Sequence, residues 1–394
     1  MSQIDPGTPT WLRARNDRTA FRLLLDHGPL SRAALSDLSG MSKPTATQML
    51  KRLERVGLIA PVGEASGGRG PNAITYGVRT DTITGVAVSI LEHAMHAVVV
   101  DAVDGEHPIV EVVRPLSQRS PQADVRAASS AACVAAGIPE ESVSRVVIGV
   151  QAAVFVDGDE LSFTDTLPGW PARGARRQIE DALDLAVTID NDVNLATMAE
   201  RSSGVAQDVD AFVLVWLGSG LGVGVDVDGT VLRGAHGGAG EIGYLSAPRT
   251  ASALDPEAAD MTDLVGAPGV VHIVGGAPGD DFTSALARLA GDDAALAALA
   301  ARIVLVVDPL LAVLDPALVV LGGPTAGVGG ETLANLVAER IDQVARPQLH
   351  VRTSGTGDQP VLLGARQQLV EQIRRELEDQ ISSSTEPQHR SVAP

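Results

Sequence analysis

The sequence predicts two kinds of folded unit in one chain: a small helical module that ends in a β-hairpin, and a larger α/β domain. Three observations support this. Residues 1–80 hold 11 Arg and Lys against 6 Asp and Glu, whereas the remaining residues hold 19 against 43. Apolar residues recur at helical spacing up to residue 56. From residue 81 onward, short strand-like apolar runs alternate with helical stretches, which is typical of α/β layers.

The composition limits the class of protein. With 394 residues, 45% hydrophobic and 20% charged, the chain is long enough for two or three globular domains. No uninterrupted apolar run approaches the roughly 18 residues of a membrane span, and residues 1–22 lack the apolar core of a signal peptide. Cys133 is the only cysteine, which excludes an intramolecular disulfide. We therefore expect a cytoplasmic protein that makes no membrane contact.

The basic module is expected to contain three helices and a hairpin. Ser and Gly residues mark the helix ends, because Ser is a favoured N-cap and Gly ends helices. The expected elements are a helix over residues 11–27, a short helix between Ser31 and Gly40, a helix over residues 43–56 that Ser42 caps, and strands over residues 58–62 and 73–78. A sharp turn between the second and third helices, followed by a hairpin, is typical of a winged helix-turn-helix.

The third helix of this module is expected to bind DNA. Its polar and basic residues recur on the side opposite its apolar residues, and Thr, Gln, Lys and Arg side chains can reach base edges and phosphates in the major groove. An arginine on the Gly-rich hairpin loop suits a narrow minor groove. The expected DNA contacts are Ser42, Lys43, Thr45, Thr47, Gln48, Lys51, Arg52 and Arg69. The alternative is that the basic stripe is only a solvated helix face.

The α/β domain is expected to begin at residue 81. Strands are expected at residues 83–88, 97–103, 145–150, 187–189, 211–217, 222–227, 318–321 and 361–363. Helices are expected at residues 122–136, 172–184, 192–201, 282–308, 331–345 and 366–381.

Two polar segments of this domain could bind a sugar in a cleft. Asn191 and Asp192 follow an expected strand and begin an expected helix, where their side chains could bind sugar hydroxyls. Glu241 adds a carboxylate within a Gly-rich stretch. Either segment alone could also be an ordinary helix cap or turn.

Two Gly-rich segments could approach a phosphate. Residues 213–224 are expected to form a strand, a turn and a second strand, and backbone amides in such a turn can hold phosphate. The glycines concerned are Gly218, Gly220 and Gly222. Residues 314–323 are expected to form a helix end, a strand and a glycine turn. Both patterns are weak on their own.

Taken together, these segments resemble the ROK family (repressors, open reading frames and kinases), and the resemblance covers nearly the whole chain. It implies a winged helix-turn-helix domain over residues 1–80 and an actin-like, two-lobed domain over residues 81–381. The final helix, residues 366–381, would close on the first lobe, and residues 382–394 would be a disordered tail. The resemblance also implies that Asn191, Asp192 and Glu241 bind sugar, that Asp192 occupies the catalytic-base position, and that Gly218, Gly220 and Gly222 are what remains of a phosphate loop.

The chain departs from the family pattern at two places. Where ROK kinases have an Asp and a phosphate-binding turn, this chain has Ala87, Ile90 and Leu91. Phosphoryl transfer depends on positioning and charge neutralisation, so we expect no kinase activity and no cofactor. Tyr244 replaces the family's zinc-binding His, and residues 245–270 contain no cysteine, so we expect no metal.

These expectations describe a transcriptional regulator, most simply a repressor, of carbohydrate genes. It would bind a palindromic operator as a homodimer or higher homo-oligomer and would respond to a sugar or sugar derivative bound without phosphorylation. Two alternatives stay open: an active sugar kinase with an accessory DNA-binding domain, and a regulator whose sensor domain binds no small molecule. His236 could contact sugar or only hydrogen-bond locally, and Trp170 could line the cleft or pack in the core.

Overall fold

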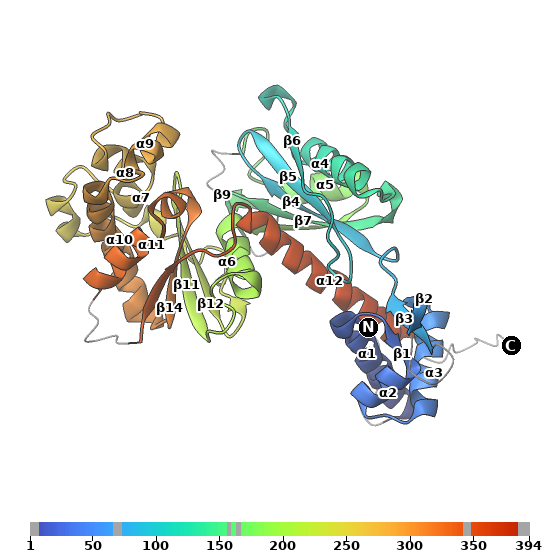
Figure 1. The fold of residues 1–394 in the computed structure, drawn as a ribbon. Coiled ribbons are helices and arrows are strands. Elements are labelled where there is room, and N and C mark those ends of the chain that lie inside the picture. Colours follow the sequence, from blue (N-terminus) through green and yellow to red (C-terminus); the bar gives the residue numbers. More distant parts are fainter. Residues whose placement is uncertain (1–7, 66–72, 156–158, 163–166, 342–347, 385–394) are drawn as a thin grey trace.

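The structure, a computed structural model, describes residues 8–65, 73–155, 159–162, 167–341 and 348–384. A small helical module and two α/β lobes follow one another along the chain (Figure 1). The long C-terminal helix, α12 (Pro360–Ser384), runs from the region between the lobes to the module (Figure 1).

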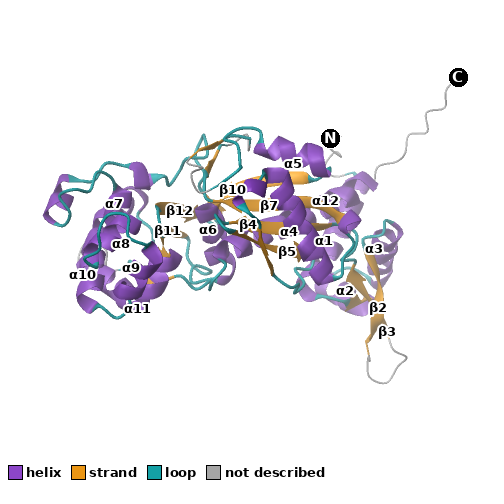
Figure 2. Ribbon diagram, turned by 90° about the horizontal axis from the view of Figure 1, so that it is seen from above, coloured by secondary structure: helices purple, strands orange, loops and turns teal. Residues whose placement is uncertain are grey.

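The module is the predicted winged helix-turn-helix. It comprises α1 (Pro9–His27), β1 (Leu30–Ser31), α2 (Arg32–Ser39), α3 (Lys43–Arg55), β2 (Ile59–Ala65) and β3 (Ala73–Val78). The N-caps are as predicted, because the Ser31 and Ser42 hydroxyls accept hydrogen bonds from the backbone N–H groups of Ala34 and Thr45. Leu30 and Ser31 add an unpredicted short strand, so the sheet has the order β1-β3-β2. The β2–β3 hairpin projects from the module (Figure 2).

The first lobe is built on a sheet in the order β10-β7-β4-β5-β6. Its strands are β4 (Thr84–Ile90), β5 (Ala94–Val100), β6 (Val110–Val113), β7 (Val143–Val150) and β10 (Ala186–Asn191), with a small hairpin of β8 (Ala153–Val154) and β9 (Leu161–Ser162). Helices α4 (Pro121–Ala136) and α5 (Ala175–Leu183) cover one face of the sheet, and α12 covers the other (Figure 1). Successive side chains of β4 point to opposite faces of the sheet and enter two different cores: Val86 and Val88 face α4, while Ala87 faces α12.

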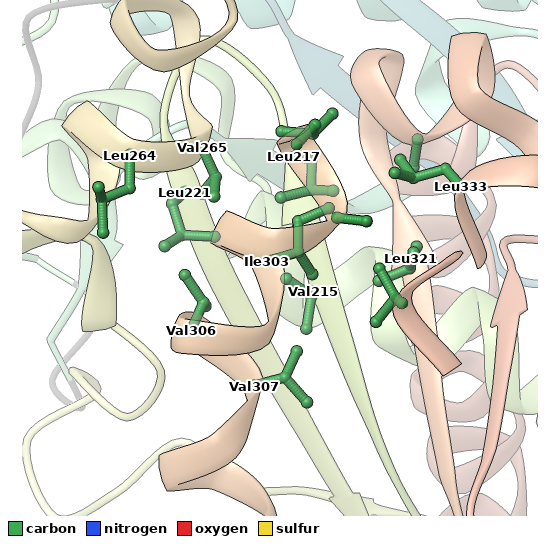
Figure 3. Close-up of a cluster of buried hydrophobic side chains, with 14 of the residues drawn as sticks. Val215, Leu217, Leu221, Leu264, Val265, Ile303, Val306, Val307, Leu321 and Leu333 are labelled. Carbon is green, nitrogen blue, oxygen red and sulfur yellow. The ribbon is translucent and has the colours of Figure 1, made fainter. Parts of the chain in front are cut away.

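The second lobe is built on a sheet in the order β13-β12-β11-β14-β15. Its strands are β11 (Ala211–Leu217), β12 (Leu221–Val227), β13 (Thr230–Val231), β14 (Leu318–Gly322) and β15 (His350–Thr353). Helices α7 (Met261–Val265), α8 (Ala267–Ile273), α9 (Phe282–Leu289), α10 (Asp293–Leu314) and α11 (Gly323–Arg340) lie on one side. In Figure 3, Ile303, Val306 and Val307 of α10 lie against Val215 and Leu221 of the sheet.

Helix α6 (Asp192–Ser203) joins the two lobes. It packs against the face of the second sheet opposite α10, where Val193 and Ala196 contact Phe212 and Leu214. On its other side it contacts α12 very closely, because a Cβ at Gly364 would lie 1.8 Å from the Leu195 carbonyl oxygen. Only glycine permits this approach.

One hydrophobic core is shared by the module, α12 and the first lobe. Phe21 and Leu24 of α1 belong to the same buried cluster as Ile373 and Leu377 of α12 and Ala87 of β4. Arg22 strengthens the contact, since it donates to both carboxylate oxygens of Glu378 at 2.7 and 2.6 Å. The module is therefore packed against α12 as well as tethered by the chain.

Several predicted boundaries were wrong. Residues 361–363 form the first turn of α12 and no strand, and the fifth strand of the second lobe, β15, was not predicted. Residues 282–308 contain two helices, α9 and α10, because the chain breaks at Gly291. Helix α12 continues to Ser384, so residues 382–384 do not belong to a tail, and residues 385–394 lie outside the described residues.

Among the described residues, α10 is long and apolar enough to cross a membrane. The search of the sequence for an uninterrupted apolar run missed α10 because Arg302, Asp308 and Pro309 interrupt its apolar residues. Half of its apolar window is buried in the second lobe, and its buried residues pack in that lobe's core. We interpret α10 as a core helix.

Candidate functional site

A cavity of about 410 Å³ lies where the two lobes meet. It takes residues from the β10–α6 junction, the β11–β12 turn and the loop before α7. The lining residues that the argument uses are Asn191, Asp192, Trp216, Gly218, Gly220, Gly222, Glu241, Tyr244, Asp260, Phe282 and Pro324. The structure therefore brings the predicted sugar-side residues and the predicted glycine turn to one pocket.

Asn191 holds the β10–α6 junction in place. Its Oδ1 accepts hydrogen bonds from the N–H groups of Val193 and Asn194 at 2.9 and 3.1 Å, which caps α6. Its Nδ2 donates to the Ala152 carbonyl at 3.0 Å. Because the side-chain oxygen is already used twice, the remaining amide hydrogen is the group that Asn191 can offer to a ligand.

Asp192 and Glu241 bring two carboxylates into the pocket. Burial, with a smaller contribution from the neighbouring Glu241 charge, raises the pKa of Asp192 to about 7. Burial also raises the pKa of Glu241. Asp192 accepts one hydrogen bond, from the Val193 N–H at 2.9 Å. A carboxyl group that changes protonation near neutral pH can either accept a hydrogen bond from a sugar hydroxyl or donate one to it.

The glycines of the β11–β12 turn serve mainly close packing. A Cβ at Gly222 would lie 2.7 Å from Val193 of α6, and a Cβ at Gly218 would lie 3.2 Å from the Trp216 indole nitrogen. Gly220, in contrast, has open space around it. The turn is closed by a hydrogen bond from the Gly218 N–H to the Gly220 carbonyl at 3.0 Å. Two of the three predicted phosphate-loop glycines thus have a structural reason to be glycine.

Asp190 was not singled out from the sequence, yet it connects the pocket to both other parts of the chain. It is buried at the end of β10, next to Asn191. Its Oδ2 accepts hydrogen bonds from Arg233 Nη2 at 2.6 Å and from Gln368 Nε2 at 3.1 Å. Arg233 follows β13 of the second lobe and Gln368 belongs to α12. The available sequence signal was an acidic residue at the end of the expected strand over residues 187–189, directly before Asn191.

The face of α3 is mostly as predicted. Ser42, Lys43, Gln48 and Lys51 are exposed, and Thr45 and Thr47 are partly exposed. Arg55, which was left out of the predicted contacts, is exposed near them. Arg69 lies outside the described residues.

Arg52 is not on that free face. Its Nε and Nη2 donate to the two oxygens of Asp17 in α1 at 2.7 and 2.6 Å. Asp17 is only 2% exposed. The prediction that Arg52 points outward was wrong, because α1 covers the edge of α3 on which Arg52 lies. Its guanidinium holds α3 against α1.

Comparison with known proteins agrees with both parts of the fold. A model of winged helix-turn-helix DNA-binding domains matches residues 13–60, and a model of the ROK family matches residues 120–266. The chain carries a ROK family domain behind a winged helix-turn-helix. The predicted resemblance and fold class are thereby confirmed.

A xylose repressor and a transcriptional dual regulator are among the similar proteins. A xylose repressor of Bacillus subtilis is 22% identical over 247 residues, which cover 62% of this chain and 63% of that protein. The DNA-binding transcriptional dual regulator NagC of Escherichia coli is 23% identical over 248 residues, 62% of this chain and 60% of NagC. These matches span less than two thirds of either relative.

Solved ROK structures show the same fold. A ROK family transcriptional regulator, a homologue of the E. coli MLC protein, superposes with a TM-score of 0.66 at 18% identity, covering 95% of this chain and 98% of that one. A ROK hexokinase from Thermus thermophilus superposes with a TM-score of 0.58 at 24% identity, covering 72% of this chain and 97% of that one. The hexokinase match fits an actin-like sugar-kinase fold for the two lobes.

The first hairpin of the ROK domain is filled by core side chains. Ala87 and Ile90 are buried in the two cores on either side of the first sheet, and the Leu91 carbonyl accepts a hydrogen bond from Arg119. None of Ala87, Ile90 and Leu91 is among the described residues that line the cavity. The three residues that replace the Asp and the phosphate-binding turn of ROK kinases therefore lie away from the cavity, and Ile90 points into the first lobe.

The loop that carries zinc in the ROK pattern is held here by an ion-pair network. Asp255 is 5% exposed and accepts hydrogen bonds from Arg302 Nη1 at 3.1 Å and His272 Nδ1 at 2.6 Å. Arg302 also donates to the Leu254 and Leu264 carbonyls. These bonds tie the loop to α8 and α10. Over the described residues, no group of three or more His, Cys, Asp or Glu side chains is arranged for a metal ion.

The structure shows the positions of Trp170 and His236, for which the sequence left two roles open. Trp170 is buried in the first lobe, where its Nε1 donates to Asp124 at 2.9 Å, so it packs in the core and does not line the cavity. His236 is exposed and is not among the described lining residues. Neither residue supports a sugar contact in this structure.

Proposed function

We propose that this chain is a sugar-responsive transcriptional regulator that binds a palindromic operator as a homodimer in the cytoplasm. The supporting observation is the free face of α3: Lys43, Gln48 and Lys51 are exposed, and among the described residues their side chains make no hydrogen bond or ion pair. Side chains of these types, aligned on a recognition helix, fit the major groove. The ROK repressors similar to this chain carry names that agree with this role.

The sugar would bind at Asn191, Asp192 and Glu241 without being phosphorylated. A kinase must neutralise the charge of the transferring phosphate. Ala87 has no carboxylate to support a metal ion, and no Lys, Arg or His is among the described residues lining the cavity. We therefore propose that Asp192 is a ligand-binding group and not a working base.

The structure offers a route from the pocket to DNA. Asp190 is adjacent to the pocket and bonds to Arg233 and to Gln368 of α12. Helix α12 then contacts α1 through Arg22 and Glu378. A ligand that changes lobe closure would shift Arg233 against Asp190, and α12 would transmit the shift to the module. Such coupling requires that the sugar bind the two states with different affinity.

The test begins with DNA duplexes selected from a random library by the full chain. Fluorescence anisotropy should then show operator binding that weakens in Lys51→Ala and Gln48→Ala. Arg249→Ala, which removes an exposed charge outside the module, should leave affinity unchanged. A panel of sugars should shift the affinity in one direction. Equal affinity of the α3 variants and the wild type would refute the DNA-binding mode.

Two other outcomes would favour the alternatives. ATP-dependent formation of a sugar phosphate, lost in Asp192→Asn, would show that the chain is a kinase. Operator binding that no sugar alters, without any sugar-induced rise in melting temperature, would show a regulator whose sensor domain binds no small molecule.

A further inference from the structure

The cavity between the lobes is lined by two chemically different groups of residues. Asn191, Asp192 and Glu241 supply hydrogen-bonding groups. Trp216, Phe282 and Pro324 line it as well and supply apolar surface. A volume of about 410 Å³ falls in the range of pockets for drug-sized ligands, and a single pyranose ring is smaller than such ligands. One sugar ring at the carboxylates would therefore leave part of the cavity unfilled.

Trp216 is held in place as a platform. It lies on β11 between Gly222 of β12 and Gly322 of β14. A Cβ at Gly322 would lie 3.3 Å from the indole Cε3, and a Cβ at Gly218 would lie 3.2 Å from Nε1. The ring therefore lies across two glycines that leave room for it. Trp216 is only partly buried, and its Nε1 has no hydrogen-bond partner among the described residues.

An indole in this position suits the second ring of a glycoside. The C–H face of a pyranose is apolar and can pack on the aromatic face, while the indole N–H can donate to a ring hydroxyl. Because Trp216 is only partly buried, its N–H is open to such a partner from the cavity.

The charges in the cavity oppose a phosphorylated ligand. Asp192, Glu241 and Asp260 are carboxylic acids, and the described lining contains no Lys, Arg or His. A phosphate would therefore find no compensating cation among these residues, and each carboxyl group that is ionised would repel it. The same argument disfavours a nucleotide in the cavity.

We propose that the effector is an unphosphorylated glycoside of two rings, with one ring at Asn191, Asp192 and Glu241 and the second ring stacked on Trp216. This inference rests on the proposed function, because it assumes that the cavity is the sensor site. It adds the class of sugar and the residue that selects it.

The experiment is isothermal titration calorimetry of the full chain with matched sugars. The probes are glucose, glucose 6-phosphate, cellobiose and maltose, together with galactose, galactose 6-phosphate and lactose, and xylose and xylobiose. We expect one disaccharide to bind about tenfold or more tightly than its monosaccharide. We expect the sugar phosphates to bind more weakly than the free sugars.

Two variants assign the preference to the indole. Trp216→Ala should lower the affinity for the disaccharide about tenfold and leave the monosaccharide within about threefold. Trp216→Phe keeps an aromatic ring and should retain most of the preference. Trp11→Ala, which removes an indole from α1 outside the cavity, should change neither affinity. If Trp216→Ala does not fold, Trp216→Phe and the wild-type series still decide the question.

The outcomes separate this inference from the proposed function. A monosaccharide or a sugar phosphate that binds as tightly as every disaccharide would overturn the two-ring inference and leave a sugar sensor standing. Undiminished disaccharide binding in Trp216→Ala would do the same. If no probe binds, both the inference and the sugar-responsive function fail.

Discussion

Replacing Arg52 with alanine is expected to destabilise the DNA-binding module. Arg52 makes two hydrogen bonds to Asp17, and Asp17 is almost completely buried. Removing one partner of a buried ion pair leaves the other charge uncompensated, at a cost of about 3–5 kcal/mol. Since the pair joins α1 to α3, the loss should reach the recognition helix.

The cost of Arg52→Ala should depend on pH. Burial raises the pKa of Asp17, although Arg52 opposes that shift. An acid whose pKa is raised in the folded state makes the fold less stable as the pH rises through the window above its ordinary value. Without Arg52 the pKa of Asp17 should rise further. The variant should therefore lose more stability at pH 8 than at pH 5.

Urea unfolding followed by circular dichroism measures the loss, and hydrogen exchange of α1 and α3 amides localises it. Lys51→Ala is the matched control, because Lys51 is exposed on the same helix and should change stability by no more than about 0.5 kcal/mol. The double variant Asp17→Asn, Arg52→Ala removes the stranded charge and should recover part of the loss. An Arg52→Ala protein as stable as Lys51→Ala would refute this reasoning, and a loss of operator affinity in it would then reflect a direct DNA contact.

Three further predictions follow from the structure. Lys51→Ala should reduce the salt dependence of operator binding by about one unit of slope if Lys51 meets a phosphate, and an unchanged slope would contradict that contact. Because burial raises the pKa of Asp192 to about 7, the free energy of unfolding of the wild type should fall by up to about 4 kcal/mol between pH 4 and 7 and level off above pH 7. Asp192→Asn should abolish this fall, whereas Asp208→Asn, at an exposed position, should retain it. If ion pairs rather than zinc hold the loop around Asp255, elemental analysis of untagged protein should find well under one zinc per chain, and Arg302→Met should raise hydrogen exchange in this loop. Stoichiometric zinc or unchanged exchange would contradict this prediction.

Local signals were predictable from the sequence, and long-range partners were not. Ser31 and Ser42 cap their helices as expected because the cap involves only the next turn of backbone. Arg52 was misplaced because helical periodicity groups residues on one side without showing which edge another helix will cover. Residues 361–363 were misassigned because a short apolar run fits either a strand or a buried helix turn.

In the candidate site, too, the residues were predictable from the sequence but their long-range partners were not. The sequence brought Asn191, Asp192 and Glu241 to attention, and the structure places all three in one cavity. Asp190 escaped notice because its partners, Arg233 and Gln368, lie 43 and 178 positions away. No periodicity in the sequence connects residues at such separations, and only the folded lobes bring them together.

The shared core around α12 has a consequence for the order of synthesis. The DNA-binding module leaves the ribosome first, and domains generally fold in that order. The buried cluster that contains Phe21 and Leu24 of the module is completed by residues of α12 such as Ile373 and Leu377, which are made more than three hundred residues later. The nascent module therefore exposes apolar surface until α12 has been synthesised. A ribosome that stops before α12 would release a chain whose module lacks this covering helix, so incomplete chains should be poor competitors for the operator.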